Sequence, residues 1–279
     1  MISYPHNTLI GYKEIFNELI KIYSSNSLPN KILFSGRKGI GKSTFAYHLI
    51  NYLFSTDEDF KYDLFENKIN LLNKSHKLLI SGSHPNFFKI SLNSEKKYID
   101  ISQVREMINF ANKSSFNNKE KIILIDDCEY LNKNSSNALL KIIEEPQNNL
   151  LFLLIHDNQK KIESTLKSRC VEFKFNINEN TTKEIVNSVM NEDIFDKISA
   201  DFINYSNTPL NYINFINICN SFNLDYQNIT IEDFVSFIFN NKSNLKKILS
   251  NDDIKFYLEL YFLKSKLLIK NENLFNLFS

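Results

Sequence analysis

The sequence feature that most constrains the fold is a glycine-rich segment between two apolar ones. Residues 36–44 read GRKGIGKST, which fits the pattern G-x-x-x-x-G-K-[ST]. Residues 31–35, KILFS, have the composition of a strand, and residues 45–54 have that of an apolar helix. A strand, a glycine loop and a helix in this order predict a phosphate-binding loop. The alternative is a glycine turn that precedes a helix and binds no phosphate.

The residues of this loop suit the triphosphate of ATP. Glycines let backbone N–H groups close around phosphate oxygens, and the N-terminus of the following helix adds a favourable dipole. Lys42 is expected to reach the β- and γ-phosphates, and the Ser43 hydroxyl is expected to hold Mg²⁺. The predicted ATP-binding residues of the segment are Gly36, Gly39, Gly41, Lys42, Ser43 and Thr44.

A buried strand that ends in carboxylates is predicted further along the chain. Residues 122–125 are continuously apolar and are followed at once by Asp126 and Asp127. This is typical of a central parallel strand, whose carboxyl end lies at one edge of a sheet. Asp126 is predicted to bind Mg²⁺, directly or through water, and Asp127 to orient the water that attacks ATP. The interval before these acids leaves room for a strand at 87–90 and a helix around Val104.

The helix that follows carries acids at its end. It is predicted from about Ser135 to Glu144, because Pro146 stops it. Glu144 and Glu145 lie at its C-terminal end, where the helix dipole disfavours anions. Two interpretations of these acids remain open: an ion pair with Lys141 one turn back, or contact with a partner.

One more apolar strand, at 150–155, is followed by the polar residues His156 and Asp157, and the strand-like residues 171–175 end the α/β region. The remainder is predicted to be helical, because apolar residues recur there at helical spacing. Helices or helical fragments are expected at about 12–24, 64–72, 182–190, 198–205, 212–222, 231–240 and 253–269.

Composition excludes several classes of protein. The 279 residues allow a sizeable core, and a net charge of +1 gives no overall attraction to DNA or to a membrane surface. The longest apolar run, 150–155, is too short to span a membrane, and residues 1–10 lack the pattern of a signal peptide. Cys128, Cys170 and Cys219 lie far apart, which predicts free thiols in a reducing compartment. A cytoplasmic protein is expected.

Five short motifs are informative in combination rather than singly. They are TLIGY at 8–12, GSHPNFF at 82–88, IDISQVREM at 99–107, NALLKIIEEP at 137–146 and SRC at 168–170. Combined with the glycine loop and the acidic strand, they resemble the AAA+ clamp-loader subunits of bacterial replicases. The resemblance is close over residues 5–175 and holds only by position in the helical remainder.

The resemblance implies an α/β P-loop AAA+ domain with a parallel sheet at 1–175, a small helical lid at 176–216 and a short helical collar at 217–279. It implies ATP and Mg²⁺ as cofactors. The implied partners are the other loader subunits (gamma or tau, and delta), a sliding clamp and primed DNA, with no membrane. By the same resemblance, Arg169 is an arginine finger that acts in trans, on ATP bound by a neighbouring subunit.

Departures from the family pattern weaken hydrolysis at the chain's own site. Asp127 stands where the motor subunits usually carry Glu, and misplacement of such a group by about 1 Å can cost about 10²-fold in rate. His156 and Asp157 stand where the motors carry a Thr or Asn that senses the γ-phosphate. The lid segment 206–215 lacks the motors' arginine, and no arginine follows Arg169. An intact finger beside a weakened site predicts a stator subunit.

Two other functions remain open. One is a self-sufficient motor ATPase of the gamma or tau type, and the other is a structural collar protein whose P-loop is vestigial. Many family members carry a four-cysteine zinc module, but residues 55–85 contain only His76 and His84 as soft ligands, so no zinc site is predicted. The helix start near Ser135 and Ser136 either faces DNA in the assembled ring or is a solvated helix face.

Overall fold

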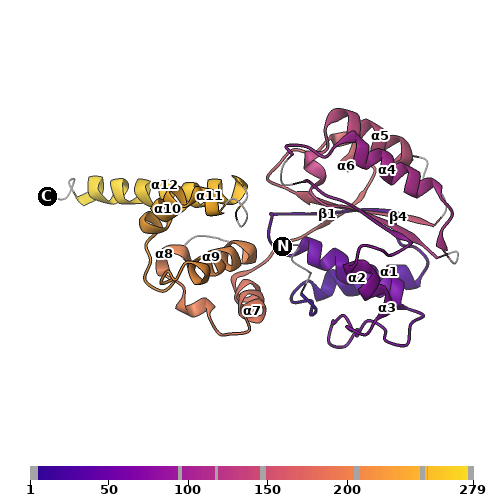
Figure 1. Ribbon diagram of the computed structural model, residues 1–279, viewed down its shortest axis with the longest axis horizontal. Helices are drawn as coiled ribbons and strands as arrows, with labels where there is room; N and C mark the ends of the chain where they lie inside the picture. Colours follow the sequence, from indigo (N-terminus) through magenta and orange to yellow (C-terminus); the bar gives the residue numbers. More distant parts are fainter. Residues whose placement is uncertain are drawn as a thin grey trace. The chain divides into compact units, whose positions relative to one another are not determined.

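The chain folds into two compact units, Met1–Thr181 and Thr182–Ser279. The computed structural model describes residues 6–93, 96–116, 119–144, 149–203, 208–245, 249 and 251–275. The first unit is an α/β domain and the second is helical, which confirms the predicted fold class (Figure 1).

A sheet of five parallel strands forms the centre of the first unit, in the order β2-β3-β4-β1-β5. The strands are β1 (Lys31–Gly36), β2 (Phe87–Ile90), β3 (Lys121–Ile125), β4 (Leu150–Asp157) and β5 (Val171–Lys174). β4 therefore lies between β1, which precedes the glycine loop, and β3, which precedes Asp126. Because the strands are parallel, the loop and the acids lie at the same edge of the sheet, where α/β proteins bind ligands.

Helices cover both faces of this sheet (Figure 1). One layer consists of α1 (Lys13–Ser24), α2 (Lys42–Ser55) and α3 (Lys74–Ile80). The other consists of α4 (Ile101–Asn112), α5 (Lys133–Glu144) and α6 (Ser164–Lys167), and a short 3₁₀ helix, η2, spans Cys128–Tyr130. Alternate residues of β3 serve the two layers: Ile122 and Leu124 pack with the first, and Ile123 and Ile125 with the second. Burial on both faces explains why β3 is continuously apolar.

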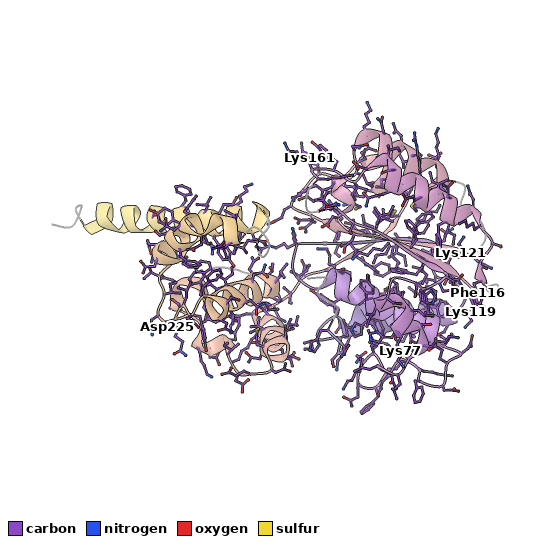
Figure 2. The ribbon with its side chains drawn as sticks, in the orientation of Figure 1. Lys77, Phe116, Lys119, Lys121, Lys161 and Asp225 are labelled. Carbon is purple, nitrogen blue, oxygen red and sulfur yellow. The ribbon has the colours of Figure 1, made fainter. Side chains whose placement is uncertain are left out.

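The first residue of β3 is a buried lysine that ties α4 to the sheet. The Lys121 ammonium donates to the carbonyl oxygens of Phe110, Ala111 and Lys113 at the C-terminal end of α4 (Figure 2). The last carbonyls of a helix have no partner within it, and the dipole there favours a cation. Lys121 therefore stabilises the end of α4 while its backbone starts the strand.

The second unit has a hydrophobic core built from most of its helices. Its elements are α7 (Glu179–Met190), η3 (Phe195–Lys197), α8 (Ala200–Ile203), α9 (Pro209–Ser221), α10 (Ile231–Asn240), α11 (Lys242–Leu245) and α12 (Asn251–Phe275). Phe202, Phe215 and Phe234 pack ring against ring, with centroids 3.9 to 5.5 Å apart. Within the described residues, no helix is long and apolar enough to cross a membrane.

The predicted boundary between lid and collar, after residue 216, falls inside α9. The core of the second unit contains residues from both sides of that position, such as Phe202 and Tyr257. The α/β unit extends to Thr181, past the predicted limit at 175. The separation of the helical unit into a lid and a collar stays a prediction.

The helical fragments predicted around 64–72 are wrong. Residues 61–73 form turns and isolated bridges, and the helix of this region is α3. Its start is fixed by Asn73, whose side chain accepts a hydrogen bond from the N–H of His76 at 2.6 Å. The Glu58 carboxylate accepts further N–H groups of the first turn. These caps outweigh the weak apolar pattern of the preceding segment.

β4 is longer than predicted, because its pairing with β1 continues to Asp157. His156 and Asp157 are therefore the last residues of the strand rather than the first of a loop. Glu145 and Pro146, and the end of the helix predicted to reach residue 205, lie outside the described residues.

Two phenylalanines provide a matched test of the core of the α/β unit. Phe34 of β1 is fully buried, whereas Phe65 is 88% exposed. Phe34→Ala is expected to lower the free energy of unfolding by about 3–5 kcal/mol, because it leaves a cavity in the packed core. Phe65→Ala is expected to change it by no more than about 0.5 kcal/mol. Urea unfolding measures both, and similar losses for the two variants would contradict the assigned core.

Candidate functional site

The glycine loop joins β1 to α2 in a conformation that depends on its glycines. Gly41 has φ 95°, a region that strains any residue with a side chain. A Cβ on Gly36 would lie 2.5 Å from the carbonyl oxygen of Phe175, so no larger residue fits there. The Tyr12 hydroxyl donates to the carbonyl oxygen of Ile40 at 2.8 Å and fixes the loop to the start of α1.

Lys42 is the first residue of α2, with Gly39 in the loop before it and Thr44 in the first helical turn. It is buried, and its Nζ donates to the carbonyl oxygens of Gly36 and Arg37, both at 2.7 Å. Burial lowers the pKa of Lys42, and nearby carboxylates offset this effect only in part. Those carboxylates belong to Asp157, Glu129, Asp126 and Asp127.

The two predicted Mg²⁺ ligands lie together. The Ser43 hydroxyl, on α2, donates to Oδ2 of Asp126, after β3, at 3.0 Å. The backbone of Asp126 is held in turn by β2, because its N–H donates to the carbonyl oxygen of Ile90 at 2.8 Å. A hydroxyl and a carboxylate are hard oxygen ligands of the kind that Mg²⁺ prefers, so this pair of side chains fits that ion.

A group of acids follows Asp126. Asp127 has a left-handed backbone, with φ 60°, and burial raises its pKa, as does the charge of Asp126. Glu129 belongs to the same group, because the N–H of Asp157 donates to its Oε2 at 3.2 Å. The pKa of Glu129 is raised to about 7, mainly by burial, with a smaller contribution from the charges of Asp127 and Asp157. The sequence patterns did not single out Glu129, and the one signal for it is its place shortly after the two aspartates.

His156 and Asp157 end β4 beside the glycine loop, where Asp157 pairs with Gly36. Both side chains are buried. The Nε2–H of His156 donates to the carbonyl oxygen of Lys160 at 3.0 Å, and burial lowers the pKa of the ring, which is therefore neutral at pH 7. Oδ1 of Asp157 accepts the N–H of Gln159 at 3.1 Å. A neutral ring and a carboxylate thus end β4 beside the glycine loop.

A lysine from β2 reaches the same aspartate that Ser43 contacts. The Nζ of Lys89 is 3.4 Å from Oδ2 of Asp126 and 5.4 Å from the ring centroid of Tyr47. Burial disfavours the charge on Lys89, but Asp126 and Tyr47 outweigh burial, so the pKa of Lys89 lies above its usual value. The sequence patterns missed Lys89, because its approach to Asp126 depends on the pairing of β2 with β3.

Arg169 lies between α6 and β5. Its Nη2 is 2.6 Å from Oε1 of Glu144, and its Nη1 donates to the carbonyl oxygen of Thr165 at 2.8 Å. Glu144 therefore pairs with Arg169 rather than with Lys141, and the cation compensates an acid at the C-terminal end of α5. The Arg169 side chain is 36% exposed. The sequence placed Arg169 and Glu144 in separate motifs and gave no sign of their contact.

The hydroxyls of Ser135 and Ser136, for which contact with DNA and exposure to solvent were both left open, make hydrogen bonds inside the domain. Ser135 donates to the carbonyl oxygen of Ile99 at 3.0 Å, and Ser136 donates to the carboxylate of Glu163. Both serines are buried. These two side chains therefore do not present hydrogen-bond donors to a duplex.

The histidines and cysteines of the described residues do not gather into a metal site. Within the part of the chain that the structure describes, no group of three or more His, Cys, Asp or Glu side chains is arranged to hold a metal ion. His84 stacks on Phe54 with ring centroids 4.0 Å apart, and burial lowers its pKa to about 4. Cys128, Cys170 and Cys219 form no disulfide.

The parallel sheet, the strand–loop–helix around Lys42 and the contact of Ser43 with Asp126 define an α/β protein of the P-loop AAA+ class. A sequence profile of the family described as "DNA polymerase III, delta subunit" matches residues 11–179, which is more than half of the chain. The chain belongs to this family. The resemblance to clamp-loader subunits is thereby confirmed at the level of the family.

Individual relatives include more than one subunit type. DNA polymerase III subunit delta' of Pseudomonas aeruginosa is 35% identical over 99 residues, which cover 36% of this chain and 30% of that protein. For Buchnera aphidicola subsp. Schizaphis graminum, subunit gamma is 32% identical over 61% of this chain and 44% of its own length. Subunit delta' of the same organism is 28% identical over 66% of this chain and 53% of its own length. The chain thus spans about half or less of these relatives.

Solved structures with a similar fold are more distant. The Thermotoga maritima RuvB Holliday junction branch migration motor is 17% identical, with a TM-score of 0.46, and the match covers 80% of this chain and 69% of that one. A DNA polymerase III gamma subunit-related protein of the same organism is 18% identical, with a TM-score of 0.43, and the match covers 88% of this chain and 67% of that one.

The raised pKa of Glu129 predicts a pH-dependent stability. The folded state keeps the proton on Glu129 up to about pH 7, whereas the unfolded chain loses it near the ordinary pKa of a glutamate. Stability contributed by the neutral carboxyl is therefore present in acid and is lost as pH rises through about 7. Glu129→Gln should be more stable than wild type at pH 8 by on the order of 2 kcal/mol, and nearly equal to it at pH 5.

Urea unfolding at the two pH values measures this difference. The exposed Glu66→Gln provides the control, which should show the same small difference at both pH values. A Glu129→Gln effect independent of pH would contradict a protonated Glu129 among Asp127, Asp157 and Lys42.

Proposed function

We propose that the chain is a delta-prime-type subunit of a DNA polymerase III clamp loader, which binds ATP, hydrolyses it slowly and acts on a neighbouring ATP site through Arg169. The observation that carries the binding part is the 3.0 Å contact between Ser43 and Asp126 at the end of an intact glycine loop. The motifs HPNFF at 84–88 and IDISQVRE at 99–106 favour the delta-prime type within the family.

The loop has the chemistry that a nucleotide triphosphate requires. Lys42 is buried at the N-terminus of α2, where the helix dipole favours an anion, and its ammonium already uses carbonyl oxygens as acceptors. A phosphate would give it a charged acceptor instead, which makes a stronger hydrogen bond. Ser43 and Asp126 would hold Mg²⁺, which supplies neutralisation of phosphate charge.

The residues that would drive hydrolysis are less suitable. Asp127 is one methylene shorter than the glutamate of the motor subunits, so its carboxylate reaches less far toward an attacking water, and a misplacement of about 1 Å can cost about 10²-fold in rate. His156 and Asp157 stand in place of the γ-phosphate sensor. No arginine follows Arg169 in the sequence to supply the cation of the lid. Slow turnover by the isolated chain follows.

Arg169 is the residue proposed to act on a partner. Its guanidinium is held on the surface by Glu144 and Thr165 and stays partly exposed, as a group that reaches into a neighbouring subunit must be. In the assembled loader its charge would stabilise the transition state of hydrolysis at the neighbour's site. The proposed setting is cytoplasmic, with the gamma or tau and delta subunits, the sliding clamp and primed DNA as partners, and with the helical unit serving as lid and collar.

A second candidate is a gamma-type motor that hydrolyses ATP by itself. It is favoured by the gamma relative, which is 32% identical over 61% of this chain. Steady-state ATP turnover separates the two proposals. The delta-prime proposal predicts turnover by the isolated chain at least about 10²-fold below the roughly 10 s⁻¹ typical of enzymes. Turnover near that typical rate, abolished by Lys42→Ala, would establish the motor instead.

ATP binding is expected to depend on Lys42. Lys42→Ala should weaken the affinity for a fluorescent ATP analogue by about 10²-fold, because a charge-assisted hydrogen bond contributes about 1.5–3 kcal/mol. Lys77→Ala, which removes a lysine from α3, should leave the affinity unchanged (Figure 2). Equilibrium fluorescence titration measures both. If wild type and Lys42→Ala bound the ATP analogue equally well, the glycine loop would not be an ATP site. Of the functions considered, only a structural collar protein with a vestigial loop would then remain.

The action of Arg169 is testable only in the assembled loader. Arg169→Ala should bind ATP like wild type as an isolated chain, but should lower the ATPase rate of the reconstituted complex by roughly 10³-fold at the affected site. Lys161→Ala removes an exposed cation nearby in the sequence and serves as control (Figure 2). A complex with unchanged ATPase activity at every site would rule out the action in trans.

A further inference from the structure

The carboxylate of Asp126 forms an ion pair with the ammonium of Lys89. Lys89 is the third residue of β2, and β2 pairs in parallel with β3, which ends just before Asp126. The Nζ of Lys89 lies 3.4 Å from Oδ2 of Asp126, and the same oxygen accepts the Ser43 hydroxyl at 3.0 Å. One oxygen of the carboxylate that is proposed to hold Mg²⁺ is therefore already contacted by an ammonium and by a hydroxyl.

This ion pair is built into the fold. The N–H of Asp126 donates to the carbonyl oxygen of Ile90, the residue after Lys89, at 2.8 Å, so the two backbones have a fixed register. The ring of Tyr47, on α2, lies 5.4 Å from the Nζ of Lys89, close enough for a cation–π contact. The side chains of Lys89 and Asp126 are 33% and 17% exposed, so the pair is partly shielded from solvent. Its charges therefore interact more strongly than those of a surface pair.

The charge of Lys89 changes what Asp126 offers to a metal ion. A carboxylate attracts Mg²⁺ through its negative charge, and a neighbouring ammonium neutralises that charge while repelling the ion itself. The same ammonium adds a positive charge at the edge of the sheet where the triphosphate is proposed to bind, which favours the nucleotide. Lys89 therefore weakens the attraction of Asp126 for Mg²⁺ while it favours the nucleotide.

We propose that the ammonium of Lys89 neutralises the charge of Asp126. Nucleotide binding by this chain then depends only weakly on Mg²⁺. The inference rests on the proposed ATP site and deepens it, because it states how that site responds to the metal. It assigns a positioning and charge-compensating role to a residue outside the glycine loop and outside the acidic strand. Such a site would keep ATP bound even when Mg²⁺, which hydrolysis requires, is not in place.

The test compares affinities for a fluorescent ATP analogue in Mg²⁺ and in excess EDTA. For wild type, the two dissociation constants should differ by no more than a few-fold. For Lys89→Met, which keeps the length of the side chain and removes its charge, affinity in EDTA should fall by about tenfold or more relative to affinity in Mg²⁺. Lys89→Arg keeps the charge and should behave like wild type, and Lys77→Met controls for the loss of a lysine elsewhere.

A second measurement follows metal binding directly, at a nucleotide concentration that saturates the protein. Binding of Mn²⁺, in place of Mg²⁺, to the nucleotide-loaded protein is followed by electron paramagnetic resonance, and Lys89→Met should bind Mn²⁺ about tenfold more tightly than wild type. Thermal unfolding confirms that the variants are folded. If Lys89→Met does not fold, the role of Lys89 is tested on wild type and Lys89→Arg. For both proteins, the dissociation constants in Mg²⁺ and in EDTA should differ by no more than a few-fold.

The possible failures are distinguishable. A wild-type affinity that falls by about 10²-fold in EDTA, as for a site held together by Mg²⁺, would overturn the role of Lys89 and leave the proposed function intact. Identical metal dependence of wild type and Lys89→Met would do the same, and would leave Lys89 as a structural ion pair only. Absence of nucleotide binding both with and without metal would overturn the proposed function, and the inference with it.

Discussion

The parallel pairing of β4 with both β1 and β3 is the constraint on which the rest of the site depends. It sets the strand order, so that the glycine loop after β1 and the acids after β3 meet at one edge of the sheet. Residues that are distant in the sequence, Ser43 and Asp126, then come within 3.0 Å of each other. A different order of the same strands would leave the loop and the acids apart.

The charged groups at this edge of the sheet interact with one another. The carboxylates of Asp157, Glu129, Asp126 and Asp127 act on the charge of Lys42, and Lys89 is paired with Asp126. Burial raises the pKa of Glu129 to about 7, which removes one negative charge from the group in mild acid. The opposite charges of Lys42, Lys89 and these carboxylates compensate one another in part.

Local patterns predicted the strands and the loop because their residues are constrained locally. The continuous apolar run of β3 and the glycines of the loop each carry their own signal. The contacts of Lys89 with Asp126 and of Glu144 with Arg169 could not be predicted, because they depend on strand order and on packing between distant segments. The turns at 64–72 were missed for another reason: the caps of α3 outweighed a weak helical pattern.

The most direct test of the account is amide hydrogen exchange with and without saturating ATP. The account predicts that ATP slows exchange at residues 36–44 and around Asp126, and that Lys42→Ala abolishes this protection while the core strands remain protected in both proteins. Protection by ATP that appears elsewhere in the chain and spares the glycine loop would contradict a nucleotide site at this edge of the sheet.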